Sequence, residues 1–456
     1  MSQATTASAP ARTPLQRAVS RARWRLMPFL VLMYILAYLD RANVAYAKQA
    51  FQASTGVSEA AFAFGAGIFF IGYALFEIPS NLILHRVGAR VWLARIMVTW
   101  GLLAACMAFA STDSLFSGLR FMLGIAEAGF FPGVILYLTL WFPARERGQM
   151  LGLFYLSQPL CFIFGGPLSG GLLSLDGLWG LHGWQLMFIV EGLAAAVVGV
   201  IAFFYLTSRP DDAHWMPKDE RDALAAELER ERQRKALHGN LKLGSALKDP
   251  LVLHFALTYF LIAMCGYGIA FYLPAQIGTL LGMKVGLQVS LVSAIPWTCA
   301  FIVCLFWPGM AVRSGRRRTF AVISLLCAGL GMIATGYASP LIGVSLLCVS
   351  VVGLISAQPI FWTFPSGYLG GVAAAGGIAL INALGNLGGF VAPTLKVFAE
   401  ARLQTPTAGF WVIGAGALLA AVMISLIPRR ADRAVSDEAD EEAAEIPPST
   451  VVRVNS

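Results

Sequence analysis

The stretch from Thr319 to Leu395, TFAVISLLCAGLGMIATGYASPLIGVSLLCVSVVGLISAQPIFWTFPSGYLGGVAAAGGIALINALGNLGGFVAPTL, decides the fold. It contains no Asp, Glu, Lys, Arg or His. Because about 20 apolar residues suffice for a helix to cross a bilayer, this stretch alone holds about three spans. Glycine and proline, rather than charged loops, separate its segments. The sequence therefore predicts a protein that crosses a membrane several times.

The composition of the whole chain supports the same interpretation. Of its 456 residues, 57% are hydrophobic and only 13% are charged, and the mean hydropathy is +0.70. This leaves too little polar surface for a soluble globular protein. The hydropathy pattern predicts an all-α protein with twelve transmembrane helices, at residues 27–46, 61–84, 91–110, 117–140, 149–172, 184–206, 251–279, 287–308, 319–338, 341–363, 374–396 and 408–427.

The positions of the basic residues predict how the chain is oriented. A net charge of +8 and a pI near 9.2 could also indicate nucleic-acid binding. If the N-terminus is inside, however, 27 of the 33 Lys and Arg fall in cytoplasmic segments. Cytoplasmic loops of membrane proteins carry such an excess, so we expect both termini in the cytoplasm and no nucleic-acid partner. Four basic residues fall on the outer side: Lys48, Lys284, Lys396 and Arg402.

The cysteine and histidine patterns indicate neither a metal site nor an enzyme. All seven cysteines fall inside predicted spans, where they act as small apolar residues, and no metal-ligand spacing is present. The five histidines are scattered through loops and helix ends. We therefore expect no metal, disulfide or cofactor, and no nucleophile and base for catalysis. The cysteines are Cys106, Cys161, Cys265, Cys299, Cys304, Cys327 and Cys348.

The predicted helices form two similar halves. Each half has six helices and carries a basic glycine turn after its second helix, around Gly88 and Gly315. Two six-helix bundles related by a pseudo-two-fold axis along the membrane normal are the architecture of major facilitator transporters. The expected organisation is a basic cytoplasmic tail at 1–26, an N-terminal bundle at 27–207, a cytoplasmic linker at 208–250, a C-terminal bundle at 251–428 and a disordered acidic tail at 429–456. An organellar transit peptide is an alternative reading of 1–26.

Several short motifs carry a more specific resemblance. In order and spacing they resemble the anion:cation symporter family of the major facilitator superfamily, and its tartrate-transporter branch in particular. They are YLDR at Tyr38–Arg41, GIFFIGYALFEIPSN at Gly67–Asn81, GIAEAGFFPG at Gly124–Gly133, WFP at Trp141–Pro143, GWQ at Gly183–Gln185 and IALINALGNLGGFV at Ile378–Val391.

This resemblance implies a function. A member of the family is expected to import a small organic anion, such as tartrate or a related hydroxy- or aromatic carboxylate, by proton-coupled symport through alternating access. The expected location is the cell inner membrane, where the chain spans the lipid bilayer several times. We expect protons as the coupling ion and a monomeric protein.

Four charged residues in the predicted spans supply a physical reason for transport. Asp40 and Arg41 lie deep in the first helix, and Arg120 and Glu127 lie seven residues apart on one face of the fourth. An ionisable group at membrane depth costs about 3 kcal/mol by insertion scales, so it normally faces a cavity or a partner. These four residues form either a transport site or an ion-pair network that joins the two helices.

In the transport interpretation, the two arginines and the two acids have different roles. Arg41 and Arg120 attract the carboxylate of the substrate, and Asp40 and Glu127 carry protons. An anion beside the arginines weakens their hold on the ionised acids, so binding and protonation favour each other. The family resemblance likewise assigns proton coupling to Asp40 and Glu127.

Polar residues near these charges complete the expected site. By resemblance, Tyr38, Tyr73, Gln158 and Asn382 bind hydroxyls or the carboxylate of the substrate, although such side chains also serve helix packing. Weaker candidates for the cavity are Asn386, Tyr267, Tyr272, Trp362 and Thr363. Glu77 and Glu191 are read as structural contacts near helix ends.

Two features leave other functions open. Gly166–Gly171, GPLSGG, fits the Gly-Pro-x-x-Gly-Gly pattern of antiporters, so an efflux antiporter is the nearest alternative, and a non-transporting membrane sensor is a further one. The family's loop motif also departs from its pattern, because His85 and Val312 stand where an acid is usual. The expected salt-bridge latch is therefore in doubt on both halves.

Overall fold

The computed structural model describes residues 12–237, 249–368, 372–405 and 407–428, and within these ranges it is helical and has no strand. The first half of the chain forms α1 (Pro14–Thr55), α2 (Glu59–Val87), α3 (Ala89–Cys106), α4 (Asp113–Glu127), α5 (Phe130–Trp141), α6 (Ala144–Tyr155), α7 (Ser157–Leu160), α8 (Gly166–Leu173), α9 (Gly183–Tyr205) and α10 (Lys218–Leu237). The second half forms α12 (Pro250–Leu281), α13 (Leu287–Cys304), α14 (Trp307–Arg313), α15 (Arg317–Thr335), α16 (Pro340–Tyr368), α17 (Val372–Asn386), α18 (Gly388–Leu403) and α19 (Ala408–Ser425).

Within the described ranges, 11 helical segments are long and apolar enough to cross a membrane. They correspond to all the predicted spans except the one at 374–396. That segment is divided at Leu387 into α17 and α18, of 15 and 16 residues, and neither reaches the length of a span alone. The fold is thus an all-helical membrane fold, as the hydropathy predicts.

Two other predicted spans are also interrupted. The helix predicted at 117–140 breaks between α4 and α5, where Gly129 has a φ of 86°, a conformation that residues with a Cβ rarely adopt. The helix predicted at 149–172 contains a π-helical segment, Cys161–Gly165, between α7 and α8. Both segments still form candidate membrane spans, Asp113–Trp141 and Gln149–Leu173, as predicted. Hydropathy detects apolar length and not backbone breaks, so the positions of the breaks were not predicted. Both breaks lie near the group of four buried charged residues described below.

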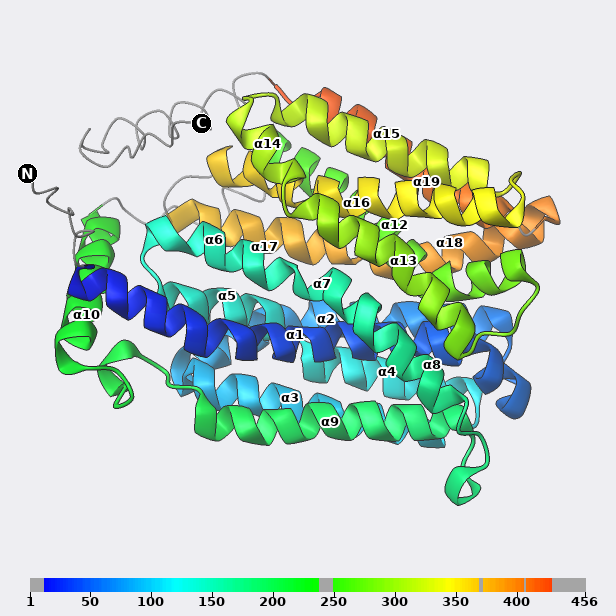
Figure 1. Ribbon diagram of the computed structural model, residues 1–456, viewed down its shortest axis with the longest axis horizontal. Coiled ribbons are helices and arrows are strands. Elements are labelled where there is room, and N and C mark those ends of the chain that lie inside the picture. The colour runs from blue at the N-terminus through cyan, green and yellow to red at the C-terminus, as the bar shows by residue number, and fades with distance from the viewer. Residues whose placement is uncertain (1–11, 238–248, 369–371, 406, 429–456) are drawn as a thin grey trace, which may run out of the picture.

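The helices lie side by side in one bundle, with α1 to α9 mostly in its lower part and α12 to α19 in its upper part (Figure 1). Within the lower part α3 packs along α9 and α2 along α4, and within the upper part α15 packs along α16 and α19. Contacts of α2 with α18, of α1 with α12 and of α8 with α13 join the two parts. The middle of α12, at Tyr267, thereby lies against Arg41 of α1.

Small residues allow the tightest of these packings. A Cβ on Gly101 of α3 would lie 2.5 Å from the backbone nitrogen of Ala196 in α9. A Cβ on Gly124 of α4 would meet the backbone oxygen of Phe69 in α2. Lipid tails are as apolar as the surfaces of these helices, so helices in membranes associate largely through such close backbone packing. Gly124 thereby brings Glu127, one turn later, into the interior of the bundle.

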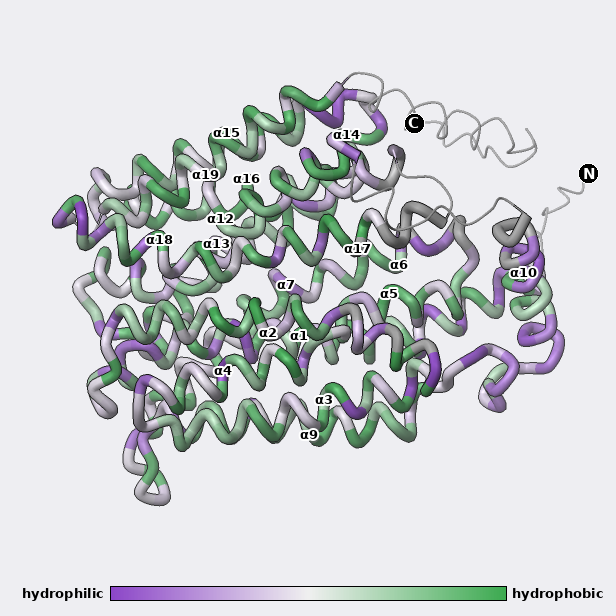
Figure 2. The backbone as a smooth tube through the Cα atoms, turned by 180° about the vertical axis from the view of Figure 1, so that it is seen from behind, coloured by the Kyte–Doolittle hydropathy of each residue, from purple (hydrophilic) through white to green (hydrophobic). Residues whose placement is uncertain are grey.

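Hydrophilic residues gather at the ends of the bundle and on α10, whereas the sides are apolar (Figure 2). The α10 helix lies across the first turns of α1. There Arg21 donates to Glu220 over 2.8 Å, and Arg17 lies 3.4 Å from the same carboxylate. The hydrogen bond from Arg21, with the nearby guanidinium charges, lowers the pKa of Glu220 below its ordinary value.

This contact makes the docking of α10 dependent on pH. Because the folded-state pKa of Glu220 is lowered, its stabilisation is complete above the ordinary glutamate pKa and is lost as the pH falls through the lowered value. Since Arg21 is 48% exposed, the contribution is about 1 kcal/mol at most. Glu220→Gln is expected to increase amide exchange across residues 218–237 about fivefold at neutral pH. Hydrogen exchange measured by mass spectrometry tests this expectation.

Asp219→Asn is the matched control. The side chain of Asp219 is 56% exposed, and its partner Arg17 still pairs with Glu220 in this variant. A smaller effect is expected for this variant. Equal exchange in both variants and in the unmodified protein would contradict the assignment of Glu220.

Candidate functional site

The four charged residues predicted from the sequence lie together in the interior. Arg41 of α1 donates through Nη2 to Oε1 of Glu127 of α4 over 2.6 Å. Glu127 and Arg120 are fully buried, and Asp40 is 5% exposed. Arg120 interacts electrostatically with both Asp40 and Glu127. The charges of this group balance, as burial in a membrane interior requires.

The break after α4 determines where Glu127 lies. Glu127 is the last residue of α4, and the chain then leaves the helical conformation at Ala128. The carbonyl of Ala128 accepts a hydrogen bond from Ser80 of α2 over 2.6 Å, so the interrupted backbone is satisfied inside the protein. The carboxylate of Glu127 therefore stands at the end of a half-helix, close to α1. Broken helices of this kind form substrate and ion sites in many transporters.

Arg120 is held differently from Arg41. None of its guanidinium nitrogens has a hydrogen-bond partner in the described part of the chain. Its Cζ lies 4.8 Å from the ring centroid of Phe69, an arrangement that stabilises a cation through the ring face. Arg120 therefore stabilises the acids through its charge and remains available to form further hydrogen bonds.

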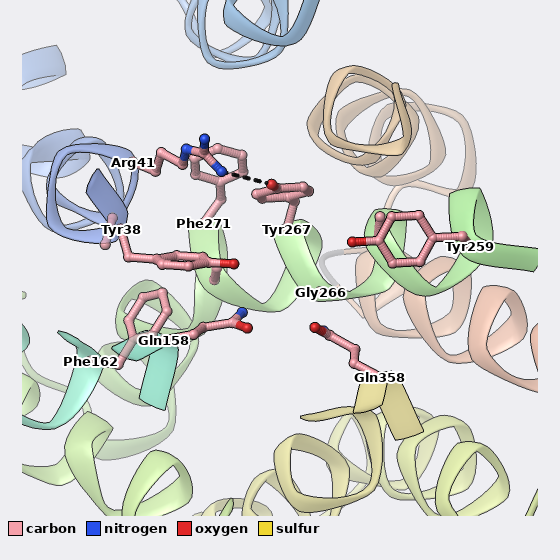
Figure 3. Close-up of a pocket in the computed structure, with 12 residues that line it drawn as sticks. Tyr38, Arg41, Gln158, Phe162, Tyr259, Gly266, Tyr267, Phe271 and Gln358 are labelled. Atoms are coloured by element: carbon pink, nitrogen blue, oxygen red, sulfur yellow. Dashed lines mark hydrogen bonds between the residues drawn. The ribbon is translucent and has the colours of Figure 1, made fainter. Parts of the chain in front are cut away.

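Arg41 also connects the two halves of the chain. Its Nη1 donates to the hydroxyl of Tyr267 in α12 over 3.1 Å, and that hydroxyl donates to Oδ1 of Asn386 in α17 over 3.3 Å. Figure 3 shows Arg41 and Tyr267 meeting at one wall of a pocket. A change in the pairing of Arg41 therefore alters contacts of helices in both halves.

The pocket beside Arg41 is a central cavity with a volume of about 30 Å³, which is room for two or three water molecules. The amides of Gln158 and Gln358 extend into it from opposite sides (Figure 3). Both amides also line a larger opening of about 500 Å³ between α6 and α7 on one side and α13, α14 and α16 on the other. The cavity is lined by Tyr38, Arg41, Ala42, Gln158, Phe162, Tyr259, Ala263, Gly266, Tyr267, Ala270, Phe271 and Gln358.

The predicted site residues divide into three sets. Tyr38, Arg41 and Gln158 line the cavity. Asp40, Arg120 and Glu127 lie in the wall behind Arg41, and the ring centroid of Tyr73 is 5.3 Å from the Cζ of Arg41. Asn382 lies apart from the cavity lining and donates to Oε1 of Glu77 over 3.2 Å. That bond, between α17 and α2, agrees with a structural contact for Glu77.

The weaker candidates are likewise divided. Tyr267 lines the cavity, whereas Tyr272, Trp362 and Thr363 are not among its lining residues. The prediction that Glu191 lies near a helix end is wrong, because it is a buried residue in the interior of α9. The side chain of His85 is outside the described residues, and Val312 is an exposed residue of α14.

Sequence reasoning missed two polar residues of the cavity, Tyr259 and Gln358. Gln358 stands in the charge-free stretch that defines the fold, directly before Pro359. An amide in the middle of an apolar span, next to a proline, was the available signal. Tyr259 offered less, because aromatic residues are common in transmembrane helices and their direction cannot be predicted from hydropathy.

At one end of the bundle, a cation–ring contact joins the halves. The ammonium groups of Lys48 from α1 and Lys396 from α18 lie 4.9 and 4.2 Å from the ring centroid of Tyr272 in α12. Each lysine also pairs with an acid, Glu59 or Glu400. Lys48 and Lys396 were predicted to lie on the outer side. The Lys48–Tyr272–Lys396 contact therefore closes the bundle at the end opposite α10.

The described residues include no group of three His, Cys, Asp or Glu side chains that could hold a metal ion. The site offers a guanidinium, two amides and three tyrosine hydroxyls around a small cavity, with buried acids close to the guanidinium. Such a site can bind an anion and exchange protons. It belongs to the class of polytopic membrane transporters with central binding cavities.

Comparison with known proteins establishes the family. Residues 30–393 match the Major Facilitator Superfamily, and the chain belongs to that superfamily. It is 42% identical to the inner membrane transport protein RhmT of Escherichia coli K12, covering 90% of this chain and 95% of that one. It is 40% identical to a candidate tartrate transporter of Agrobacterium vitis, covering 91% and 95%. A quinolone resistance transporter of Acinetobacter baumannii is 40% identical over 81% and 85%.

The fold agrees with solved structures of the superfamily. The partially occluded, inward-open xylose transporter XylE of E. coli superposes with a TM-score of 0.72 at 16% identity, over 90% of this chain and 98% of that one. Because the chain belongs to this superfamily and is similar to curated transporters over most of its length, it is a membrane transporter and not an enzyme, and the resemblance seen in the motifs is confirmed at the level of the family.

The Lys48–Tyr272–Lys396 contact makes a testable prediction about conformation. Tyr272→Leu removes the ring that both ammonium groups face, so this end of the bundle is expected to open more often. Tyr272→Phe keeps the ring face and is the matched control. Spin labels at Ser54 and Leu403, in a cysteine-free background, report the opening as a shift towards longer distances. Identical distance distributions for the two variants would contradict the role of the ring.

Proposed function

We propose that the protein is a proton-coupled symporter that imports a small organic anion by alternating access. The observation that supports this most directly is the position of Arg41, which faces the cavity and pairs with Glu127 over 2.6 Å. One guanidinium is thus shared between the substrate cavity and a buried acid. Proton coupling is expected wherever a substrate and an acid compete for the same cation.

The competition can be stated as a cycle. While Glu127 is ionised, it accepts the hydrogen bond from Nη2 of Arg41, and a substrate carboxylate would have to displace it from that donor. A proton on Glu127 removes its charge and releases Arg41 to the substrate. Because binding and protonation each favour the other, the coupling is reciprocal, and release of the proton on the inner side expels the anion. Asp40, which interacts with Arg120, provides a second acid for the same exchange.

The membrane potential favours this arrangement for import. Moving one negative charge into a negative-inside cell costs about 2.3 kcal/mol per 100 mV, and each accompanying proton offsets that amount. A symporter that carries at least one proton per carboxylate therefore avoids working against the potential.

The cavity chemistry suggests the kind of substrate. Arg41 provides one cation for a carboxylate, and Gln158, Gln358, Tyr38 and Tyr267 provide neutral donors and acceptors suited to hydroxyls. Tartrate or a related hydroxy- or aromatic carboxylate fits this set, and the similarity to candidate tartrate transporters supports the same class. Since the cavity measures only about 30 Å³, the substrate is admitted after it widens towards the larger opening.

We extend the proposal to the arrangement in the membrane. Counting α17 and α18 together as one broken span gives twelve spans, in bundles at 27–207 and 251–428 joined by the linker at 208–250. The positive-inside pattern supports cytoplasmic termini, and the relative named an inner membrane transport protein supports the cell inner membrane. The larger opening then faces the cytoplasm, and the protein acts as a monomer with no cofactor other than protons.

An efflux antiporter is the second candidate. The Gly166–Gly171 pattern follows directly on the π-helical segment Cys161–Gly165, and π-helices occur often at functional sites. The similarity to a quinolone resistance transporter points in the same direction. An antiporter would expel substrate as protons enter, so the direction of substrate flux under an inward proton gradient separates the two candidates.

Replacing Glu127 tests the proposed coupling. In proteoliposomes, Glu127→Gln is expected to reduce anion uptake driven by an inward proton gradient more than about tenfold, because the neutral amide carries no proton. Exchange of labelled for unlabelled anion across the membrane is expected to stay within about twofold, since it needs no net proton movement. Radiolabelled uptake measures both activities.

Asp113→Asn is the control for this experiment, because Asp113 is an exposed acid at the first turn of the same helix. It is expected to leave both activities unchanged. Proton-driven uptake that survives in Glu127→Gln at the level of Asp113→Asn would rule out Glu127 as the coupling acid.

A further inference from the structure

A further buried acid of the N-terminal half, Glu191, lies outside the cavity lining. Glu191 of α9 is 4% exposed, and its Oε1 accepts a hydrogen bond from the hydroxyl of Ser169 in α8 over 2.6 Å. Its other oxygen, Oε2, has no hydrogen-bond partner in the described part of the chain. Burying a carboxyl group that has an unpaired oxygen inside a transmembrane helix costs free energy, which argues against a purely structural role for Glu191.

Glu191 is linked to Asp40 of the charged site. Asn43 is fully buried one turn after Asp40 in α1, the helix that packs on α9, and it acts electrostatically on both carboxyl groups. Neither atom of its amide has a hydrogen-bond partner in the described part of the chain, and the same holds for Oδ2 of Asp40. The two acids also act on each other electrostatically. In an interior of low dielectric constant, two such acids are poorly tolerated when both are ionised, so the pair favours the state in which it holds one proton.

The surroundings of Glu191 differ from those of Glu127. Glu127 has Arg41 as a direct partner, whereas the groups that act on Glu191 are Ser169, Asn43 and Asp40, none of them a cation. Two titratable neighbours interact electrostatically with Glu191: Tyr46 of α1 and Cys161 of the π-helical segment. The α3 helix packs on α9 at this level through backbone contacts of Gly192 and adds no charge.

The position of Glu191 along the bundle shows which of the two acids, Glu191 or Asp40, lies nearer to the outer side. Phe51 near the end of α1 packs edge-on against Trp184 at the start of α9, with ring centroids 5.1 Å apart, so these two residues lie at the same level. Asp40 is 11 residues from Phe51, and Glu191 is seven residues from Trp184. At 1.5 Å per residue, Glu191 is about 6 Å nearer than Asp40 to this end, which the charge pattern places outside.

We propose that Glu191 is a third proton-carrying acid, which passes protons between the outer side and Asp40. In the step, the O–H bond of Glu191 breaks and an O–H bond on Asp40 forms, so the net charge of the pair does not change. The proposal rests on the proton coupling proposed above. It assigns Glu191 as a positioning and relay residue of that same site, without contact to the substrate.

The alternative is that Glu191 only ties α9 to α8 through Ser169. The variant Glu191→Gln separates the two roles, because the amide oxygen still accepts the Ser169 hydrogen bond but the side chain carries no exchangeable carboxyl proton. Ser169→Ala does the reverse, since it removes the tie and keeps the acid.

The experiment uses the full chain in proteoliposomes, with tartrate as the probe or whichever hydroxy acid the unmodified protein takes up. For Glu191→Gln, proton-driven uptake is expected to fall about tenfold, exchange of labelled for unlabelled anion to stay within twofold, and the rise of uptake with external acidity to flatten. Asn43→Leu is expected to act in the same direction. Ser169→Ala is expected to keep the pH profile of the unmodified protein.

Two results would overturn the proposal: an unchanged pH profile in Glu191→Gln, or equal losses of driven uptake and exchange in Glu191→Gln and Ser169→Ala, which indicates a structural tie. Failure of the proposed function has a different signature. In that case the unmodified protein itself shows no dependence of uptake on the proton gradient.

Discussion

The buried ion pair of Arg41 and Glu127 is the interaction on which the rest of the structure depends. Its two charges lie where solvation by water is absent, so each needs the other or a substitute of the same sign. A substrate carboxylate can substitute for Glu127 only if Glu127 is neutralised. In the proposed mechanism, the same requirement that stabilises the pair links anion binding to protonation.

Close helix packing and a break in α4 position this pair. Gly124 allows α4 to approach α2, and the break at Gly129 ends α4 at Glu127, so the carboxylate is presented at a half-helix terminus. From the other half of the chain, Tyr267 reaches Arg41. The pair thus lies on the boundary between two groups of helices, where a change in its charge alters contacts on both sides.

The sequence predicted the membrane class and the charged residues because both follow from the cost of placing charge in lipid. A charge-free stretch such as Thr319 to Leu395 has few other uses, and isolated acids and arginines in apolar spans must meet partners. It did not predict the breaks at Gly129 and Leu387, because glycine and leucine do not by themselves end an apolar helix. Nor could it show that Gln358 faces the cavity or that Asn382 pairs with Glu77, since periodicity gives the face of a helix but not what the face meets.

Simultaneous measurement of proton and anion movement tests the central claim most directly. Purified protein is reconstituted in liposomes with a pH-sensitive dye inside and with no imposed gradient, and labelled anion is added outside. The account predicts that the interior acidifies as the anion accumulates, and that both signals are lost together when Glu127 is replaced by Gln. Anion accumulation without a change in internal pH, or with alkalinisation of the interior, would contradict it.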